Sequence, residues 1–233
     1  MVRKIKYAVE TLRKILVTLR AMIEDFMSRP YETLRLHISK GNSKIGRTHN
    51  FSMAPGITCA NCSGCIRFCY DAKACWQYLN VRIARAENTA MMYLNRAATF
   101  AQIDNYISKC RAHKYFRWHV SGDILDTDYF DRMVQIARNH PDWIFWTYTK
   151  AYAFVNAWIE QNGKSALPSN LSVMFSIWNG MECPNPFGMP TFRCVMPGME
   201  PDPTAWKCPG NCEACLRSGH GCPFGESSEV GLH

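Results

Sequence analysis

The chain has 233 residues and a formal net charge of +8, with 47% hydrophobic and 12% aromatic residues. This length and composition suit a domain with its own hydrophobic core and exclude a miniprotein that depends on disulfides. The charge is uneven, because residues 1–50 carry eleven Lys and Arg against four Asp and Glu. Such a basic arm binds nucleic acid or an anionic surface, or it is simply a solvated face.

Residues 1–30 are expected to form an amphipathic helix. Its apolar residues step by four and three in alternation, and Pro30 ends the pattern; they are Ile5, Val9, Leu12, Leu16, Leu19, Ile23 and Phe26. Such a heptad pattern fits a helix packed on its own domain or a helix that forms a dimer. Arg13 and Glu24 interrupt the apolar residues, which is unlike a secretory signal or a membrane span. We therefore expect a cytoplasmic protein with reduced thiols.

Residues 31–200 are expected to form an α/β domain. Apolar runs predict strands at 34–38, 49–53, 115–120, 143–147 and 171–177. Helical patterns predict one helix over 74–97, a second after a Thr99–Gln102 capping box, a third from Asp126 or Thr127 to Pro141, and a fourth closed by Gly163. Because strands alternate with helices, the sheet should be parallel. Beyond Cys183 the periodicity fades, so we expect residues 201–233 to be a loop-rich tail.

Nine of the twelve cysteines fall in two short runs. The first run is Cys59, Cys62, Cys65, Cys69 and Cys75, and the second is Cys208, Cys212, Cys215 and Cys222. In a reducing compartment, thiols packed this closely are typical of a site for a soft metal. We predict metal ligands at Cys59, Cys62, Cys65, Cys69, Cys208, Cys212, Cys215 and Cys222.

The spacing within each run favours a particular metal centre. Cys59 to Cys69 have the C-x2-C-x2-C-x3-C spacing of a bacterial ferredoxin, which favours a [4Fe–4S] cluster over zinc. The spacing leaves open which four of the five early cysteines bind. The second run holds four thiols in a segment with few apolar residues, so a second [4Fe–4S] cluster is expected to order it, with zinc as the alternative.

Polar residues follow two of the predicted strands. Arg117, His119 and Asp123 lie at or past the end of one strand, and Lys150 follows the next. Because active sites of α/β proteins form at the carboxyl ends of parallel strands, we predict that these four residues are catalytic and converge beside the first cysteine run. The structural alternatives are a buried, satisfied histidine and an aspartate that caps a turn.

Several separate motifs resemble a family of phage and mobile-element proteins, that of mycobacteriophage gene product eighty-eight. The resemblance covers most of the chain from about Lys40 onward. It is carried by Lys40–Lys44, Asn50–Ser52, Cys59 to Tyr70, Arg117–His119, Ser121–Asp123, Tyr148–Lys150 and the closing Cys208 to Pro223. This family resemblance implies no particular activity.

A second resemblance concerns the order of elements. A strand, a cysteine loop, a helix and a strand that runs into Ser121-Gly122-Asp123 look like the front half of a radical S-adenosylmethionine barrel. This resemblance implies a partial (β/α) barrel in which Ser121, Gly122 and Asp123 hold an amino group of a bound molecule. The first run departs from the C-x3-C-x2-C pattern of those enzymes, and it has enough thiols to saturate a cluster.

Two function classes follow from these observations. The first is an iron–sulfur protein with two [4Fe–4S] clusters, one at the mouth of the barrel and one in the tail. Such a protein is either a redox or radical S-adenosylmethionine-like enzyme with an open iron, or an electron-transfer protein with an unidentified redox partner. The alternative is a zinc-stabilised module that binds nucleic acid through the basic N-terminal arm.

Overall fold

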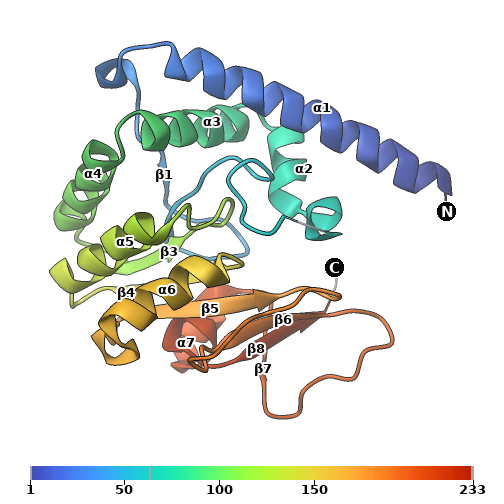
Figure 1. The fold of residues 1–233 in the computed structure, drawn as a ribbon, viewed down its shortest axis with the longest axis vertical. Coiled ribbons are helices and arrows are strands. Elements are labelled where there is room, and N and C mark those ends of the chain that lie inside the picture. Colours follow the sequence, from blue (N-terminus) through green and yellow to red (C-terminus); the bar gives the residue numbers. More distant parts are fainter. Residues whose placement is uncertain (1, 63, 232–233) are drawn as a thin grey trace.

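Eight strands form one open sheet in the computed structural model, which describes residues 2–62 and 64–231 (Figure 1). The strands are β1 (Ile38–Ser39), β2 (His49–Phe51), β3 (Tyr115–Trp118), β4 (Ile144–Thr149), β5 (Leu171–Ile177), β6 (Thr191–Val195), β7 (Trp206–Lys207) and β8 (Ser228–Gly231). Their order is β1-β2-β3-β4-β5-β6-β8-β7, and only β1 runs antiparallel to its neighbour. The α/β class and the parallel sheet are confirmed, and within the described residues the sheet stays open, with β1 and β7 as its edges.

Helices connect and cover these strands. They are α1 (Val2–Met27), α2 (Tyr70–Gln77), α3 (Leu79–Leu94), α4 (Arg96–Lys109), α5 (Thr127–Asn139), α6 (Tyr152–Asn162) and α7 (Cys212–Ser218), with short 3-10 helices η1 (Tyr31–Thr33), η2 (Gly64–Phe68), η3 (Lys164–Ala166) and η4 (Cys222–Phe224). No helix in the described part of the chain is long and apolar enough to cross a bilayer.

The apolar side chains form two core clusters. The larger one lies between the sheet and helices α4 to α6, and includes Phe116, Trp118 and Phe145. The smaller one joins the second half of α1 to α3, where Leu19 and Ile23 pack with residues such as Met91. Figure 1 shows α1 lying across α3. Packing of this helix on its own domain is thereby confirmed, whereas a dimer through α1 stays a prediction.

Local signals placed several elements correctly. Strand β5 has the predicted bounds, because its run of apolar residues is buried on both faces. Asp126 caps α5, and its side chain accepts a hydrogen bond from the Tyr129 amide. Gly163 ends α6 with a φ of 84°, a backbone conformation that glycine adopts without steric strain.

Other expectations were wrong. Of the predicted strand 34–38, only Ile38 pairs, in β1, and residues 34–37 belong to no helix or strand. The single helix predicted over 74–97 is divided between α2, α3 and the start of α4, because Tyr78 has an extended backbone and Asn95 begins a new helix. Asn95 is also the true cap of α4, since its side chain accepts a hydrogen bond from the Ala98 amide; Thr99 instead donates to backbone carbonyls within the helices.

The C-terminal part of the chain is more regular than its sequence predicted. Strands β6, β8 and β7 extend the parallel sheet, and α7 is part of the connection that leads from β7 to β8 along the chain. These strands are two to five residues long, and β6 is only half-buried. Short strands with one exposed side carry little periodicity, so pattern reading missed them. Residues 201–231 are therefore tied to the same sheet as the rest of the described chain.

Candidate metal and ligand sites

The first cysteine loop, residues 59–69, lies at the carboxyl edge of the sheet. The chain leaves β2 at Phe51, and the Met53 amide donates to the Ser121 carbonyl, 2.9 Å away, where the chain leaves β3. The loop and the strand ends enclose a cavity of about 350 Å³, the first cavity. Its lining includes the four predicted ligands of the first run and all the predicted catalytic residues: Cys59, Cys62, Cys65, Cys69, Arg117, His119, Asp123 and Lys150. The predicted convergence of these side chains beside the loop is what the fold produces.

The thiols of this loop interact with one another. The Cys62 thiol interacts with the thiols of Cys59 and Cys65. The interaction with Cys62, together with the Gly56 amide 3.3 Å from Cys59 Sγ, lowers the pKa of Cys59. The interactions with Cys59 and Cys65 raise the pKa of Cys62, and burial raises the pKa of Cys69 to about 11. Cys59 is therefore more readily converted than Cys62 or Cys69 to the thiolate that a metal requires.

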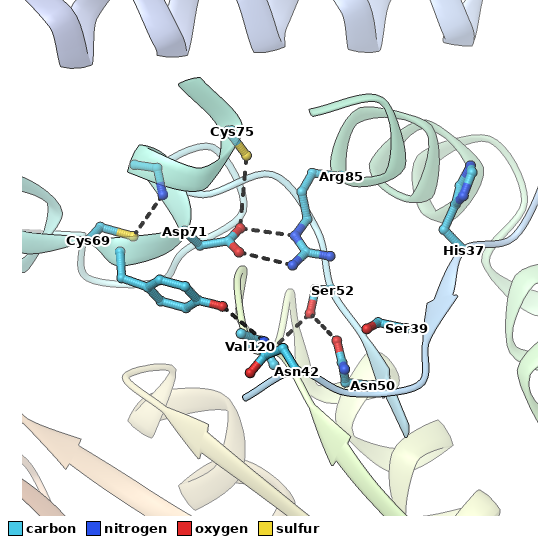
Figure 2. A network of polar contacts seen from close by, with 12 residues as sticks. His37, Ser39, Asn42, Asn50, Ser52, Cys69, Asp71, Cys75, Arg85 and Val120 are labelled. Carbon is cyan, nitrogen blue, oxygen red and sulfur yellow. Dashed lines mark hydrogen bonds and ion pairs between the residues drawn. The ribbon is translucent and has the colours of Figure 1, made fainter. Parts of the chain in front are cut away.

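The fifth cysteine of the run is separated from the cavity. Cys75 is fully buried on α2, within the smaller core cluster, and its Sγ lies 3.9 Å from an Asp71 carboxylate oxygen. Asp71 in turn receives two hydrogen bonds of 3.0 Å from Arg85 on α3 (Figure 2). The Cys69 thiol caps α2 by accepting from the Ala72 amide at 3.4 Å. The buried ion pair therefore fixes α2 against α3 and leaves Cys59, Cys62, Cys65 and Cys69 as the cavity-lining set.

Three side chains from the end of β3 each bury a polar atom in the wall of the first cavity. Arg117 Nε, His119 Nδ1 and Ser121 Oγ have no hydrogen-bond partner among the described residues. Buried polar atoms are nearly always paired, so unpaired atoms that line a cavity indicate the place of a bound molecule. The other ring nitrogen of His119 lies 2.8 Å from the Tyr129 hydroxyl. Burial and the nearby Arg117 charge lower the pKa of His119 to about 3, so its imidazole is neutral.

Asp123 joins the ends of β3 and β4. Its carboxylate accepts hydrogen bonds from the Thr149 hydroxyl at 2.6 Å and from the Lys150 and Ile124 amides, both at 2.8 Å. Burial nevertheless raises the pKa of Asp123 to about 6. These bonds give Asp123 a positioning role at the cavity wall, as in the turn-capping alternative. The Lys150 carbonyl also accepts from Asn61 of the cysteine loop, at 2.6 Å.

The second cysteine run surrounds another cavity, of about 310 Å³, which we call the second cavity. All four predicted ligands line it: Cys208, Cys212, Cys215 and Cys222. The Cys208 amide donates to the Glu229 carbonyl of β8, and the Cys212 amide donates to the Lys44 carbonyl. Burial raises the pKa of Cys222 to about 11 and also raises the pKa of Cys212. Metal binding at these thiols must therefore release protons.

A glycine makes the tight backbone of the second site feasible. Gly221 has a φ of 84°, and a Cβ at this position would lie 2.9 Å from the Trp206 ring and 3.1 Å from Cys215 Sγ. Only glycine combines this backbone conformation with so close an approach. Gly221 therefore brings Cys222 into the same cavity as Cys208 and Cys215.

Five residues line both cavities: Arg117, Tyr148, Ser176, Phe192 and Val230. Arg117 stacks over the Tyr148 ring, with its guanidinium carbon 4.5 Å from the ring centroid, and both residues line the first and the second cavity. Arg117 lies beside the Cys212 thiol and Tyr148 beside the Cys222 thiol in the wall of the second cavity. Sequence reasoning placed Arg117 beside the first run only and assigned Tyr148 no role. The position of Tyr148 near the carboxyl end of β4 was a signal that could have identified it. Sequence reasoning also missed Cys194 of β6, which lines the first cavity.

The side chains that line each cavity are of the type that binds a soft metal. Each cavity presents four thiols, the donors that zinc and iron–sulfur clusters share. Within the described residues, however, no group of three Cys, His, Asp or Glu side chains is already spaced around a single metal ion. The thiols thus converge on each cavity without closing on a common point.

A family model described as Gene product 88 matches residues 32–183, more than half of the chain. The chain therefore belongs to this phage protein family, as its motifs predicted. The matched region holds the first cysteine loop and the ends of β2 to β5, and it ends before the second run. No curated protein and no solved structure matches the chain.

Proposed function

We propose that this member of the gene product 88 family is an iron–sulfur protein with two [4Fe–4S] clusters. Cys59, Cys62, Cys65 and Cys69 would hold one, and Cys208, Cys212, Cys215 and Cys222 the other. The observation that carries the proposal is the gathering of each set of four thiols on one cavity. Thiolate ligation and partial exclusion of water are what such a cluster requires of a protein.

At the first cavity the chain's own residues would bind and orient a small polar molecule. A bound [4Fe–4S] cluster supplies one-electron transfer there. Arg117 and Lys150 present positive charge, which favours an anionic group on the ligand. Neutral His119 and Ser121 offer unpaired polar atoms for hydrogen bonds. Asp123 keeps the ends of β3 and β4 together, so that these groups stay in place.

Metal analysis after anaerobic purification tests the proposal. We expect iron and acid-labile sulfide at a ratio of one to one, with visible absorption that bleaches on reduction. Replacing Cys59, Cys65 and Cys69 together with serine should remove half of the iron, and so should replacing Cys208, Cys212 and Cys222. Cys75→Ala is the matched control, because Cys75 lies outside both cavities. Full iron content in both triple variants would refute the ligand assignment.

Zinc is the alternative metal, above all at the second site. Four cysteines on short loops are also a structural zinc set, and zinc would order the tail without any redox role. A colourless protein with stoichiometric zinc would establish this alternative, and the visible spectrum separates the two metals directly.

Cys62 decides between an enzyme and an electron carrier. It is exposed, yet it lines the first cavity and its thiol interacts with those of Cys59 and Cys65, so we propose that it is a ligand and that the first cluster is fully bound by cysteine. A radical S-adenosylmethionine-like enzyme would instead keep one iron open, with Ser121, Gly122 and Asp123 holding the amino group of S-adenosylmethionine. Iron counting in Cys62→Ala, and electron paramagnetic resonance of the reduced protein with and without S-adenosylmethionine, separate these cases. An unchanged cluster in Cys62→Ala, with a wild-type signal that S-adenosylmethionine shifts, would establish the enzyme.

A further inference from the structure

A third cavity lies at the opposite end of the strands from the cysteine sites. This basic groove, of about 940 Å³, is formed by the chain before and after β1, the amino ends of β2 and β3, and the last turns of α4. Its lining residues are Leu34, Arg35, Leu36, Lys40, Arg47, His49, Gln102, Asn105, Tyr106, Lys109, Cys110, Ala112 and His113. The groove therefore shares no residue with either cysteine site.

The charge of the groove is of one sign. Arg35, Lys40, Arg47 and Lys109 are exposed, and none of them forms an ion pair within the described residues. No Asp or Glu is among the lining residues. Four unpaired cations around one concave surface attract an anion more strongly than the same charges spread over a convex face.

The floor of the groove is apolar and aromatic. Tyr106 is half-buried, and its hydroxyl lies 2.8 Å from His49 Nδ1. Burial, together with the charges of His113 and Lys40, lowers the pKa of His49, so the floor stays neutral beneath a positive rim. Leu34 and Leu36 supply apolar walls, and Asn105 is an exposed amide at the rim.

We propose that this groove binds a single strand of nucleic acid. The rim cations come from three separate segments of the chain, so they can meet successive phosphates, which a single phosphate group could not satisfy. An aromatic and apolar floor lets bases stack inside the groove, and the exposed amide of Asn105 can hydrogen-bond to a base edge. This pairing of a positive rim with a stacking floor is typical of single-strand sites. The inference is independent of which metal the cysteines bind.

Fluorescence anisotropy tests the inference by measuring how the purified full chain binds a labelled single strand of mixed sequence. The measurement is made once with DNA and once with RNA. Arg35→Glu/Lys109→Glu should weaken binding more than tenfold at low salt. For single strands the slope of log K against log salt is about −0.7 per neutralised phosphate, so this variant should make it shallower by at least about 1.4. Arg35→Gln/Lys109→Gln should change the slope in the same direction, with a smaller loss of affinity.

Arg13→Glu/Arg20→Glu is the matched control. It changes the net charge by the same amount on exposed positions of α1, outside the groove. We expect less than a threefold loss of affinity from this variant. Equal losses in both glutamate variants would overturn the inference in favour of diffuse attraction to the whole basic surface. Absence of binding at low salt would overturn it, and so would competition by inorganic phosphate or a mononucleotide at the same phosphate concentration.

Discussion

Asp71→Asn tests whether the buried ion pair beneath the first cysteine loop holds the fold together. The Asp71 and Arg85 side chains are only 2% and 11% exposed, and two hydrogen bonds of 3.0 Å join them. The substitution keeps the size of the side chain and leaves the Arg85 guanidinium buried without a counter-charge. Breaking a buried pair from one side costs about 3–5 kcal/mol of folding free energy. In a domain of this size each kcal/mol lowers Tm by about 2–4 °C, so we expect a fall of at least about 6 °C.

Anaerobic thermal melting followed by circular dichroism measures this loss, with iron content measured on the same samples. Because Cys69 caps α2 and Asp71 anchors that helix, the cluster proposed for the first site should lose its iron before the cluster proposed for the second. Glu10→Gln is the control, since its partner Lys14 is 3.8 Å away and both side chains are about two-thirds exposed. That variant should change stability by less than about 0.5 kcal/mol. Asp71→Asn/Arg85→Gln removes both charges and should be more stable than Asp71→Asn alone. A loss below about 1 kcal/mol in Asp71→Asn would refute the reasoning.

Three further predictions concern the cysteine sites. Gly221→Ala should lower the free energy of unfolding by more than about 1 kcal/mol, since the residue has a positive φ and the new methyl group would meet the Trp206 ring. Gly219→Ala is the control, because Gly219 has a similar φ of 74° but open space around it. If urea titration finds equal losses of stability in the two variants, the close approach to Trp206 is not the cause. Burial raises the pKa of Asp123 from 3.8 to about 6, so its contribution to the free energy of unfolding is largest below pH 4, and about 3 kcal/mol of it is lost as the pH rises through 6. Thermal melting of Asp123→Asn as a function of pH should lack this loss of stability. Identical pH profiles for the variant and the wild type would contradict the prediction. Cys212→Ser should lower Tm and expose the C-terminal residues to protease, whereas wild-type melting and protease resistance would show that the second site is not structural.

Patterns local to the sequence determined much of the fold. The continuous apolar run of β5, the Asp126 cap and the Gly163 turn each depend on residues within one or two turns of the chain. The gathering of Arg117 and Lys150 beside the first cysteine loop also followed from the sequence, because parallel strands place their carboxyl ends on one edge.

Only the tertiary structure decided which cysteines and which side chains share a site. Cys75 has the spacing of a ligand but is drawn into the core by α2, because Arg85 on the next helix pairs with Asp71. Arg117 borders both cavities because the tail returns to the sheet through β8 and brings the second run beside β3 and β4. Contacts between residues this far apart depend on how whole elements pack. The periodicity of a segment records which of its faces is buried and does not record the element that buries it.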